Sequence, residues 1–323
     1  MRCVLSPITY FAFGALTLLL VCVDIWQTRG GQVTVKKAAI WSVIWVLVAM
    51  AFGVSILFFW EWYAPESHYS SGKAATAFFT GYLLEKSLSV DNLFVFAIIF
   101  HQYLVPAELR PRALLWGVIG ALVLRAAMIA VGAQLLEQFH WILYVFAAFL
   151  IWTGYKLTQP EEEEALSPLP ERVIRKVARV SNEFHGNALV RRDKLGLVLT
   201  PMAIVIAVIA MMDVMFALDS IPAIFAVTRE PFLVLAANVF ALLGLRSLYF
   251  VLQGMMDKFV YLKPALAFIM IFIGIKMLLV ETAWAIPTYV SLGVLVSVMG
   301  TAIVASVIKS RGNREGVQEE SIS

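Results

Sequence analysis

The sequence predicts an all-α polytopic membrane protein with about nine transmembrane helices, six of which form two inverted-topology three-helix repeats. Hydrophobic residues make up 61% of the 323 residues and charged residues 15%, whereas a soluble domain is roughly 45–50% apolar. The apolar residues gather in segments close to the roughly 20 residues that a membrane-spanning helix needs. A charged motif and the residues after it occur twice. Together these observations favour a membrane protein built from two related halves.

The spans follow from the positions of the apolar segments. We expect helices over 8–27, 38–60, 77–100, 113–136, 141–157, 197–227, 232–252, 262–280 and 286–308. They divide the chain into two N-terminal helices (1–76), a first repeat (77–157), a cytoplasmic linker (158–196), a second repeat (197–281) and a C-terminal helix with a polar tail (282–323). We expect the tail after Lys309 to be disordered, because it is short and polar.

The basic residues predict the orientation, because Lys and Arg concentrate in cytoplasmic loops. One set of alternate connecting segments holds most of the 25 Lys and Arg residues, and the other set holds Arg2, Lys73 and Arg229. This places the N-terminus outside and the C-terminus in the cytoplasm of a bacterial inner membrane. Within the linker, residues 171–180 alternate apolar and basic residues at helical spacing, as a helix on an anionic membrane surface does.

The repeated motif places carboxylates inside apolar spans. The first motif (85–96, EKSLSVDNLFVF) holds Glu85 and Asp91, and the second motif (213–225, DVMFALDSIPAIF) holds Asp213 and Asp219. A charge at the centre of a membrane span costs at least about 2.5 kcal/mol, so such residues usually line an ion or substrate path. Two carboxylates in each of two copies predict one site built from two halves.

The repeat extends past the motifs. Arg125 in GALVLRAAMI corresponds to Arg246 in ALLGLRSLYF, and the tripeptide at 154–156 corresponds to the one at 274–276. Each copy has three helices, and because three is odd, the two copies cross the membrane in opposite directions. Inverted repeats are typical of transporters, with the site near the midplane where the halves meet.

A proline in the second motif predicts a break in its helix. Residues six apart on an ideal helix differ by about 240° in direction, whereas residues seven apart nearly coincide. Asp219 therefore joins Asp213 and Ser220 only if the helix unwinds locally or faces a cavity from two sides. Pro222 lacks an N–H and frees the carbonyl of Leu218, although the first motif has Phe94 at the equivalent place.

The side chains suit a hard cation. Carboxylate, amide, hydroxyl and carbonyl oxygens are the ligands that Mn²⁺, Mg²⁺ and Ca²⁺ prefer, and no histidine falls within a span. We expect no catalytic residue and no permanently bound cofactor. The predicted roles are metal ligand for Glu85, Asp91, Asp213 and Asp219, secondary ligand or pathway for Asn92, Ser220, Asp24 and Asn238, charge partner for Arg125, Arg246 and Lys86, and helix break for Pro222.

The motifs also carry a family resemblance. The segments EKSLSVDNLFVF, ALDSIPAIFAVT, NVFALLGLRSLYF and FIGIKMLL resemble the TerC/Alx family of integral membrane proteins, from about Trp41 to Val304. The resemblance implies Mn²⁺ efflux and manganese homeostasis, with an older association with tellurite resistance and alkaline response. It assigns the acidic motif residues of the family to Glu85, Asp91, Asp213 and Asp219, and its first-helix aspartate to Asp24.

We therefore predict a transporter that exports Mn²⁺, with H⁺ as a candidate counter-ion and the lipid bilayer, not nucleic acid, as its surroundings. One alternative is that the carboxylates only pair with Arg125 and Arg246 to hold helices together. A second is a non-transporting scaffold in a stress-resistance, tellurite-resistance or protein-maturation complex, which would depend on the linker and tail. An intramembrane enzyme ranks last, because the chain lacks His-Glu-x-x-His and Gly-x-Ser-x-Gly motifs.

Overall fold

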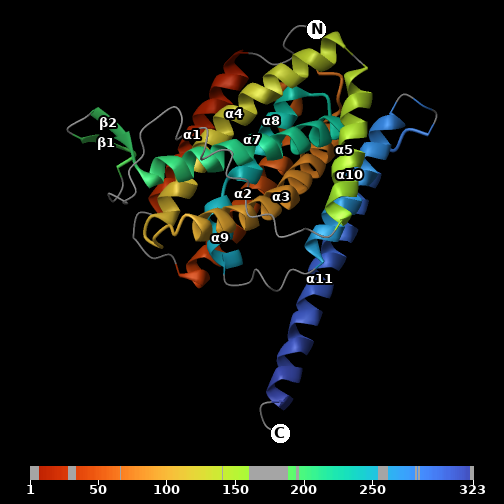
Figure 1. The fold of residues 1–323 in the computed structure, drawn as a ribbon. Coiled ribbons are helices and arrows are strands. Elements are labelled where there is room, and N and C mark those ends of the chain that lie inside the picture. The colour runs from red at the N-terminus through yellow and green to blue at the C-terminus, as the bar shows by residue number, and fades with distance from the viewer. Residues whose placement is uncertain are drawn as a thin grey trace.

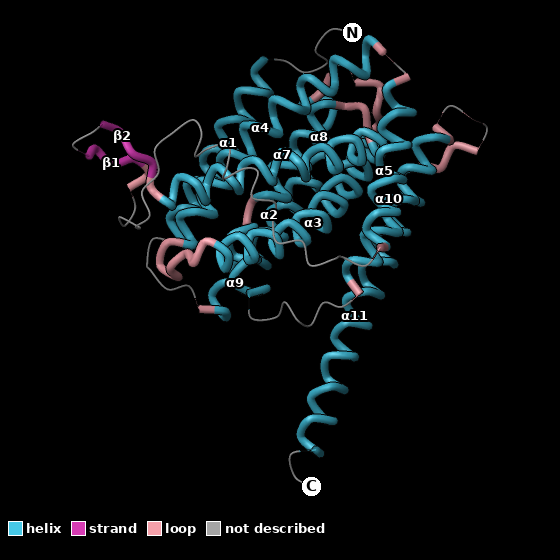
Figure 2. Tube along the Cα trace, viewed as in Figure 1, coloured by secondary structure: helices cyan, strands magenta, loops and turns pink. Residues whose placement is uncertain are grey.

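The computed structural model describes the chain except residues 1–6, 28–33, 66, 140, 160–187, 194–195, 254–260, 281, 283 and 321–323. Helices dominate the described part (Figures 1 and 2). They are α1 (Pro7–Gln27), α2 (Val35–Tyr63), α3 (Ser71–Gln102), α4 (Arg110–Gln138), α5 (Ile142–Thr158), α7 (Pro201–Val227), α8 (Pro231–Leu242), α9 (Leu245–Gln253), α10 (Leu262–Leu278) and α11 (Thr288–Glu320). Strands β1 (Val190–Asp193) and β2 (Gly196–Leu199) form one antiparallel pair.

The length and composition of these helices confirm an all-α, multi-pass membrane protein. Within the described residues, six helices are long and apolar enough to cross a membrane, and two shorter apolar helices accompany them. Polar residues fix several helix starts. The side chains of Thr34, Ser70 and Thr200 each accept a hydrogen bond from the main-chain N–H three residues on, which satisfies one of the free donors of a first turn.

Three sequence expectations need correction. The expected helix at 232–252 is two helices, α8 and α9, which are separated at Leu243 and Gly244. The helix expected from residue 197 begins at Pro201, because the four residues before Thr200 form β2 instead. Helix α11 continues to Glu320, where we expected a disordered tail. The acidic run at 161–164 and the basic segment at 171–180 lie outside the described residues.

Helices α5 and α10 cross where each of them has a glycine against the other helix, Gly154 on α5 and Gly274 on α10. A Cβ on Gly154 would lie 2.7 Å from Ile271 Cγ1 and 2.9 Å from the Ala267 carbonyl oxygen. A Cβ on Gly274 would lie 2.6 Å from Ile151 Cγ1 and 3.0 Å from the carbonyl oxygen of Ala147. The earlier part of each helix therefore faces the later part of the other, so the two helices are antiparallel. Small residues of this kind let membrane helices approach closely.

The remaining helices of the predicted repeats pair across the two halves. On α4 and α7, a Cβ on Gly117 would lie 2.7 Å from Ile209, and one on Gly132 would lie 3.0 Å from Phe225. The earlier residue of α4 contacts the earlier residue of α7, and the later residue contacts the later one, so α4 and α7 run parallel. Helices α3 and α8 also run parallel, because Gly81 faces Ala237 and Lys86 reaches Ala241.

An aromatic cluster joins the two N-terminal helices to this arrangement. Phe52 of α2 stacks on Phe240 of α8 with ring centroids 4.5 Å apart, and Phe13 of α1 packs edge-on against Phe232 at 5.1 Å. Phe78 of α3 meets the Phe52 ring at 5.2 Å. The cluster fixes α1 and α2 beside α8 and beside α3, the helix that carries the buried Glu85.

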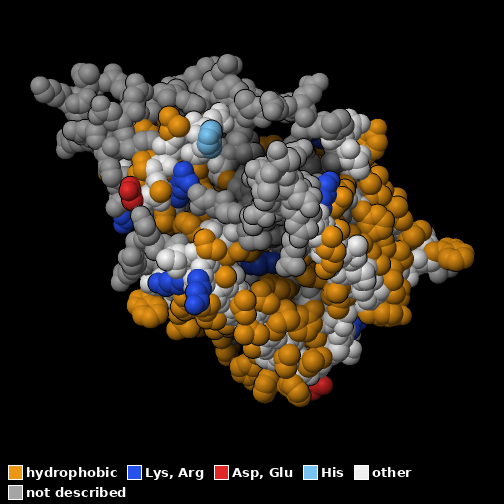
Figure 3. All heavy atoms as spheres, turned by 90° about the horizontal axis from the view of Figure 1, so that it is seen from below, with side chains coloured by type: hydrophobic (Ala, Val, Ile, Leu, Met, Phe, Trp, Pro, Cys, Tyr) orange, Lys and Arg blue, Asp and Glu red, His pale blue; other side chains and the backbone are white. Residues whose placement is uncertain are grey.

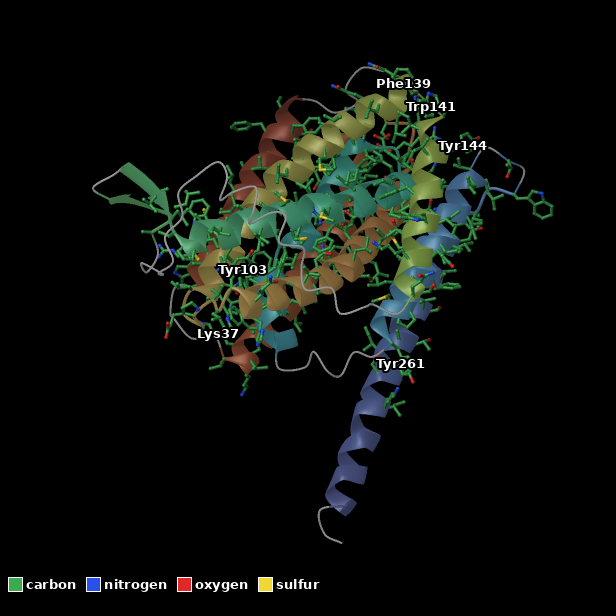
Figure 4. All side chains as sticks on the ribbon, viewed as in Figure 1. Lys37, Tyr103, Phe139, Trp141, Tyr144 and Tyr261 are labelled. Atoms are coloured by element: carbon green, nitrogen blue, oxygen red, sulfur yellow. The ribbon has the colours of Figure 1, made fainter. Side chains whose placement is uncertain are left out.

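Aromatic side chains lie at opposite ends of the bundle. In Figure 4 Phe139, Trp141 and Tyr144 lie at the upper end, around the turn between α4 and α5, while Tyr103 and Tyr261 lie lower. Trp and Tyr collect where a bilayer meets water. The view from below in Figure 3 shows Lys and Arg side chains on that lower face and hydrophobic side chains over its flank.

Candidate functional site

Arg125 is the centre of a buried polar network between the two motifs. It lies on α4, and its Nη1 donates to both carboxylate oxygens of Glu85 on α3, the longer contact being 2.9 Å. Its Nη2 and Nε donate to Asp213 on α7 at 3.2 and 3.4 Å. The three residues are at most 2% exposed. The structure therefore brings together one predicted ligand from each motif, through an arginine.

Two neutral residues complete what we call the Arg125 network. Nη1 of Arg125 also lies 3.0 Å from Asn238 Oδ1 on α8 and 3.3 Å from Ser220 Oγ on α7. The Asn238 amide in turn donates to the Val234 carbonyl at 3.0 Å, which fixes the direction of its oxygen. Arg125, Glu85, Asp213, Asn238 and Ser220 thus connect α3, α4, α7 and α8, the helices that pair across the two halves.

The charges in this network do not cancel. Glu85 and Asp213 bring two negative charges and Arg125 brings one positive charge, so these side chains carry one net negative charge among apolar helices. An uncompensated buried charge is unfavourable unless a partner approaches. The network is suited to attract a cation and unsuited to attract an anion.

The described side chains alone do not form a metal centre. Among them, no group of three His, Cys, Asp or Glu residues lies close enough to hold a metal ion. Asp91 and Asp219 lie on α3 and α7, the same helices as Glu85 and Asp213, but their side chains lie outside the described residues. Asn92, the secondary ligand predicted beside Asp91, is buried at 6% exposure.

Arg246, the second predicted charge partner, pairs with a carboxylate of the first helix among the described side chains. Its Nη1 donates to Asp24 Oδ2 on α1 at 3.2 Å. Asp24 also accepts from the Gln27 amide at 2.6 Å, and Gln27 lies 3.3 Å from Ser247 Oγ on α9. Asp24 and Arg246 are at most 5% exposed. The predicted pathway aspartate therefore pairs with Arg246, and this ion pair joins α1 to α9.

Lys86 has a different partner from its neighbour Glu85. Its Nζ donates to the main-chain carbonyls of Ala241 at 3.1 Å and Leu243 at 3.3 Å. These carbonyls lie at the junction of α8 and α9, where Gly244 has a φ of +76°. Sequence reasoning did not find this junction, because a single glycine is common in membrane helices.

The helix break predicted at Pro222 is not present in the backbone. Helix α7 continues from Pro201 to Val227 with Pro222 inside it. A proline removes one helical hydrogen bond, and neighbouring helices can satisfy the freed carbonyl in a membrane protein. The interrupted helix of the second half is the next one, at Gly244.

A bundle of apolar helices that buries carboxylates against arginine defines a multi-pass integral membrane protein with ionic groups inside the bilayer. The chain belongs to the integral membrane protein TerC family, whose model matches residues 70–314. This confirms the resemblance found in the motifs.

Sequence similarity to known bacterial proteins extends over nearly the whole chain. Alx of Escherichia coli O6:H1, named as a candidate membrane-bound redox modulator, is 41% identical over 324 residues, which cover 98% of this chain and all of the relative. A membrane protein of Myxococcus xanthus is 40% identical, and the matched region covers 95% of this chain and 94% of the relative. The tellurium resistance protein TerC of Serratia marcescens is 35% identical, covering 93% of each chain. No solved structure matches.

Proposed function

We propose that this protein exports Mn²⁺ from the cytoplasm through one carboxylate site that the two halves share. The observation that carries the proposal is the Arg125 network, in which Glu85 of the first motif and Asp213 of the second converge on a single arginine with a net negative charge. Asp91 and Asp219 follow these residues by six positions on the same helices. They supply the further carboxylates that a hard divalent cation prefers.

Cation capture in this site requires that Arg125 yields some of its hydrogen bonds. The guanidinium binds both carboxylates, and its positive charge reduces the repulsion between them. An arriving Mn²⁺ would compete for the same oxygens. Arg125 then acts as an internal counter-charge that keeps the site stable when it is empty.

We further propose that the two halves form inverted-topology repeats. The parallel pairs α4 with α7 and α3 with α8, together with the antiparallel crossing at Gly154 and Gly274, support this arrangement, because successive helices of each half reverse direction. A cysteine-accessibility scan in a cysteine-free background tests it. We expect positions 161–164 to be labelled from the cytoplasm and positions 228–230 from outside, and labelling from the same side would contradict the inversion.

Flux into proteoliposomes tests the transport proposal. Asp91→Asn and Asp219→Asn each remove a charge and a strong ligand while they preserve shape, so each should lower Mn²⁺ flux at least about tenfold, which corresponds to about 1.4 kcal/mol of lost interaction. Neutralising residues 161–164 together is the matched control, since charges in water are screened within about 8 Å at physiological salt. Flux that survives both aspartate changes would contradict the carboxylate site.

A scaffold function is the second candidate, and the hairpin of β1 and β2 favours it. The hairpin projects from one side of the helix bundle, directly before α7 (Figure 1). Exposed strand edges can pair with another chain. This candidate predicts that changes in 160–200 abolish function while Asp91→Asn and Asp219→Asn leave it intact.

A further inference from the structure

The junction of α8 and α9 exposes two main-chain carbonyls inside the bundle. Helix α8 ends at Leu242, and Leu243 has an extended conformation with φ −61° and ψ 134°. In a continuous helix Ala241 and Leu243 would accept hydrogen bonds from the N–H groups of Leu245 and Ser247. Neither bond is present across this junction. Carbonyls without water or a helical partner must find another donor within a membrane.

The Lys86 ammonium is that donor. It carries one positive charge and three N–H groups on a flexible stem, and it contacts Ala241 O and Leu243 O at 3.1 and 3.3 Å. Both oxygens lie at the C-terminal end of α8, where the helix dipole is negative. Carbonyls at interrupted membrane helices are ligands for Na⁺ and other cations. The ammonium therefore occupies a place with the chemistry of a cation site.

The other half of the molecule provides an internal comparison. Val214 follows Asp213 in the second motif, as Lys86 follows Glu85 in the first. Val123 precedes Arg125 by two residues, as Gly244 precedes Arg246, and α4 continues through it from Arg110 to Gln138. The lysine and the interrupted helix occur together on the packed pair α3 and α8, and neither occurs on the equivalent pair α7 and α4.

We propose that the carbonyls of Ala241 and Leu243 form a site for a monovalent cation, whose resident is the tethered ammonium of Lys86. A monovalent ion fits because these ligands are neutral dipoles, whereas a divalent ion binds tightly only with carboxylates. Removal of the ammonium should open the site to Na⁺ or K⁺, with water completing the ion's coordination. The proposal does not depend on Mn²⁺ transport.

Thermal unfolding of the purified protein in detergent tests this site. The Tm of wild type and of Lys86→Met is measured in NaCl, KCl and N-methylglucamine chloride at equal ionic strength. We expect the wild-type Tm to be the same in all three salts. The Tm of Lys86→Met should rise by about 2–4 °C in Na⁺ or K⁺ at ten times the dissociation constant, because a ligand that binds only the folded state stabilises it.

Lys276→Met is the matched control. Lys276 is a second buried lysine, at 5% exposure, and its Nζ has no hydrogen-bond partner among the described residues. Its removal should create no response to Na⁺ or K⁺, and an equal response in both methionine variants would overturn the proposal. If Lys86→Met does not accumulate, Lys86→Gln and Lys86→Ala are measured in the same way. The absence of a selective cation response in every folded Lys86 variant also overturns it.

Discussion

Arg125 and Arg246 hold equivalent places in the two halves, yet they bind different partners. Arg125 takes a carboxylate from each motif, Glu85 and Asp213. Arg246 pairs with Asp24, which belongs to neither half. The helices around them nevertheless pair alike, α4 with α7 and α8 with α3. The comparison shows that the two halves share their packing, whereas among the described side chains it is Arg125 that links both motifs.

The two halves also differ in helix continuity, because one of them contains the interrupted helix. Gly244 and Lys86 lie together on one side, and the continuous α4 with Val123 lies on the other. In the proposed transport mechanism, this unequal chemistry gives one central site instead of two identical ones. Four substitution experiments and one binding measurement test whether the two halves differ in this way.

The largest effect should come from the two arginines. Arg125→Ala leaves two buried carboxylates without their shared counter-charge and should destabilise the protein by at least about 5 kcal/mol, since one broken buried pair costs about 3–5 kcal/mol. Arg246→Ala removes a counter-charge of Asp24, which keeps the Gln27 amide at 2.6 Å, and should cost about 3–5 kcal/mol. Yield in the membrane and Tm in detergent measure the difference. A more damaging Arg246→Ala would contradict the central place of Arg125.

The next effect concerns the interrupted helix. Gly244→Ala should cost about 2–5 kcal/mol, because a left-handed backbone disfavours a side chain by about 1–2 kcal/mol and its Cβ would lie 2.5 Å from Trp45 Cδ1, where overpacking costs about 1–3 kcal/mol. Gly120→Ala, in the continuous α4, has no atom within 4 Å of its Cβ and should be neutral or slightly stabilising. Equal Tm values for the two variants would show that the junction tolerates a side chain.

A smaller effect tests the shared packing. Gly154→Ala and Gly274→Ala should each destabilise the crossing of α5 and α10 by about 1–3 kcal/mol, and by similar amounts, because their Cβ atoms would meet equivalent Ile and carbonyl atoms at 2.6–3.0 Å. The double variant should cost less than the sum of the two, since one separation of the helices relieves both clashes. The Tm of the three variants measures this. Full tolerance of one substitution would break the equivalence.

The smallest effect on stability should come from Pro222. Pro222→Ala supplies the N–H that the Leu218 carbonyl lacks, so the free energy of unfolding should change by less than about 1 kcal/mol. If the freed carbonyl belongs to the transport path, Mn²⁺ flux should nevertheless fall severalfold. Pro201→Ala is the control, because a proline in the first turn removes no helical bond. Unchanged flux in Pro222→Ala would exclude the Leu218 carbonyl from the path.

The helices and the meeting of Glu85, Asp213 and Arg125 could be predicted from the sequence. Long apolar segments have few alternatives to helix in a bilayer, and a buried carboxylate needs a buried cation nearby. Repetition of the motif then identified which charges belong together. These inferences depend on requirements that every membrane protein must meet.

The partners of Arg246 and Lys86 could not be predicted in the same way. Asp24 lies 222 residues from Arg246 in the chain, and nothing in the repeat links them. The junction at Gly244 depends on the fit of Trp45 against the backbone, which no local pattern records. Residues 197–199 are apolar and adjoin a span, so the pattern predicts helix, whereas pairing with β1 makes them part of a strand.

Binding of Mn²⁺ to the purified protein, followed by electron paramagnetic resonance, tests the shared site most directly. The signal of free Mn²⁺ gives the number of ions bound per chain. One shared site predicts about one ion per chain, lost in Asp91→Asn and lost equally in Asp219→Asn. Two ions per chain, with each substitution removing one of them, or binding that survives both substitutions, would contradict a single site built from the two halves.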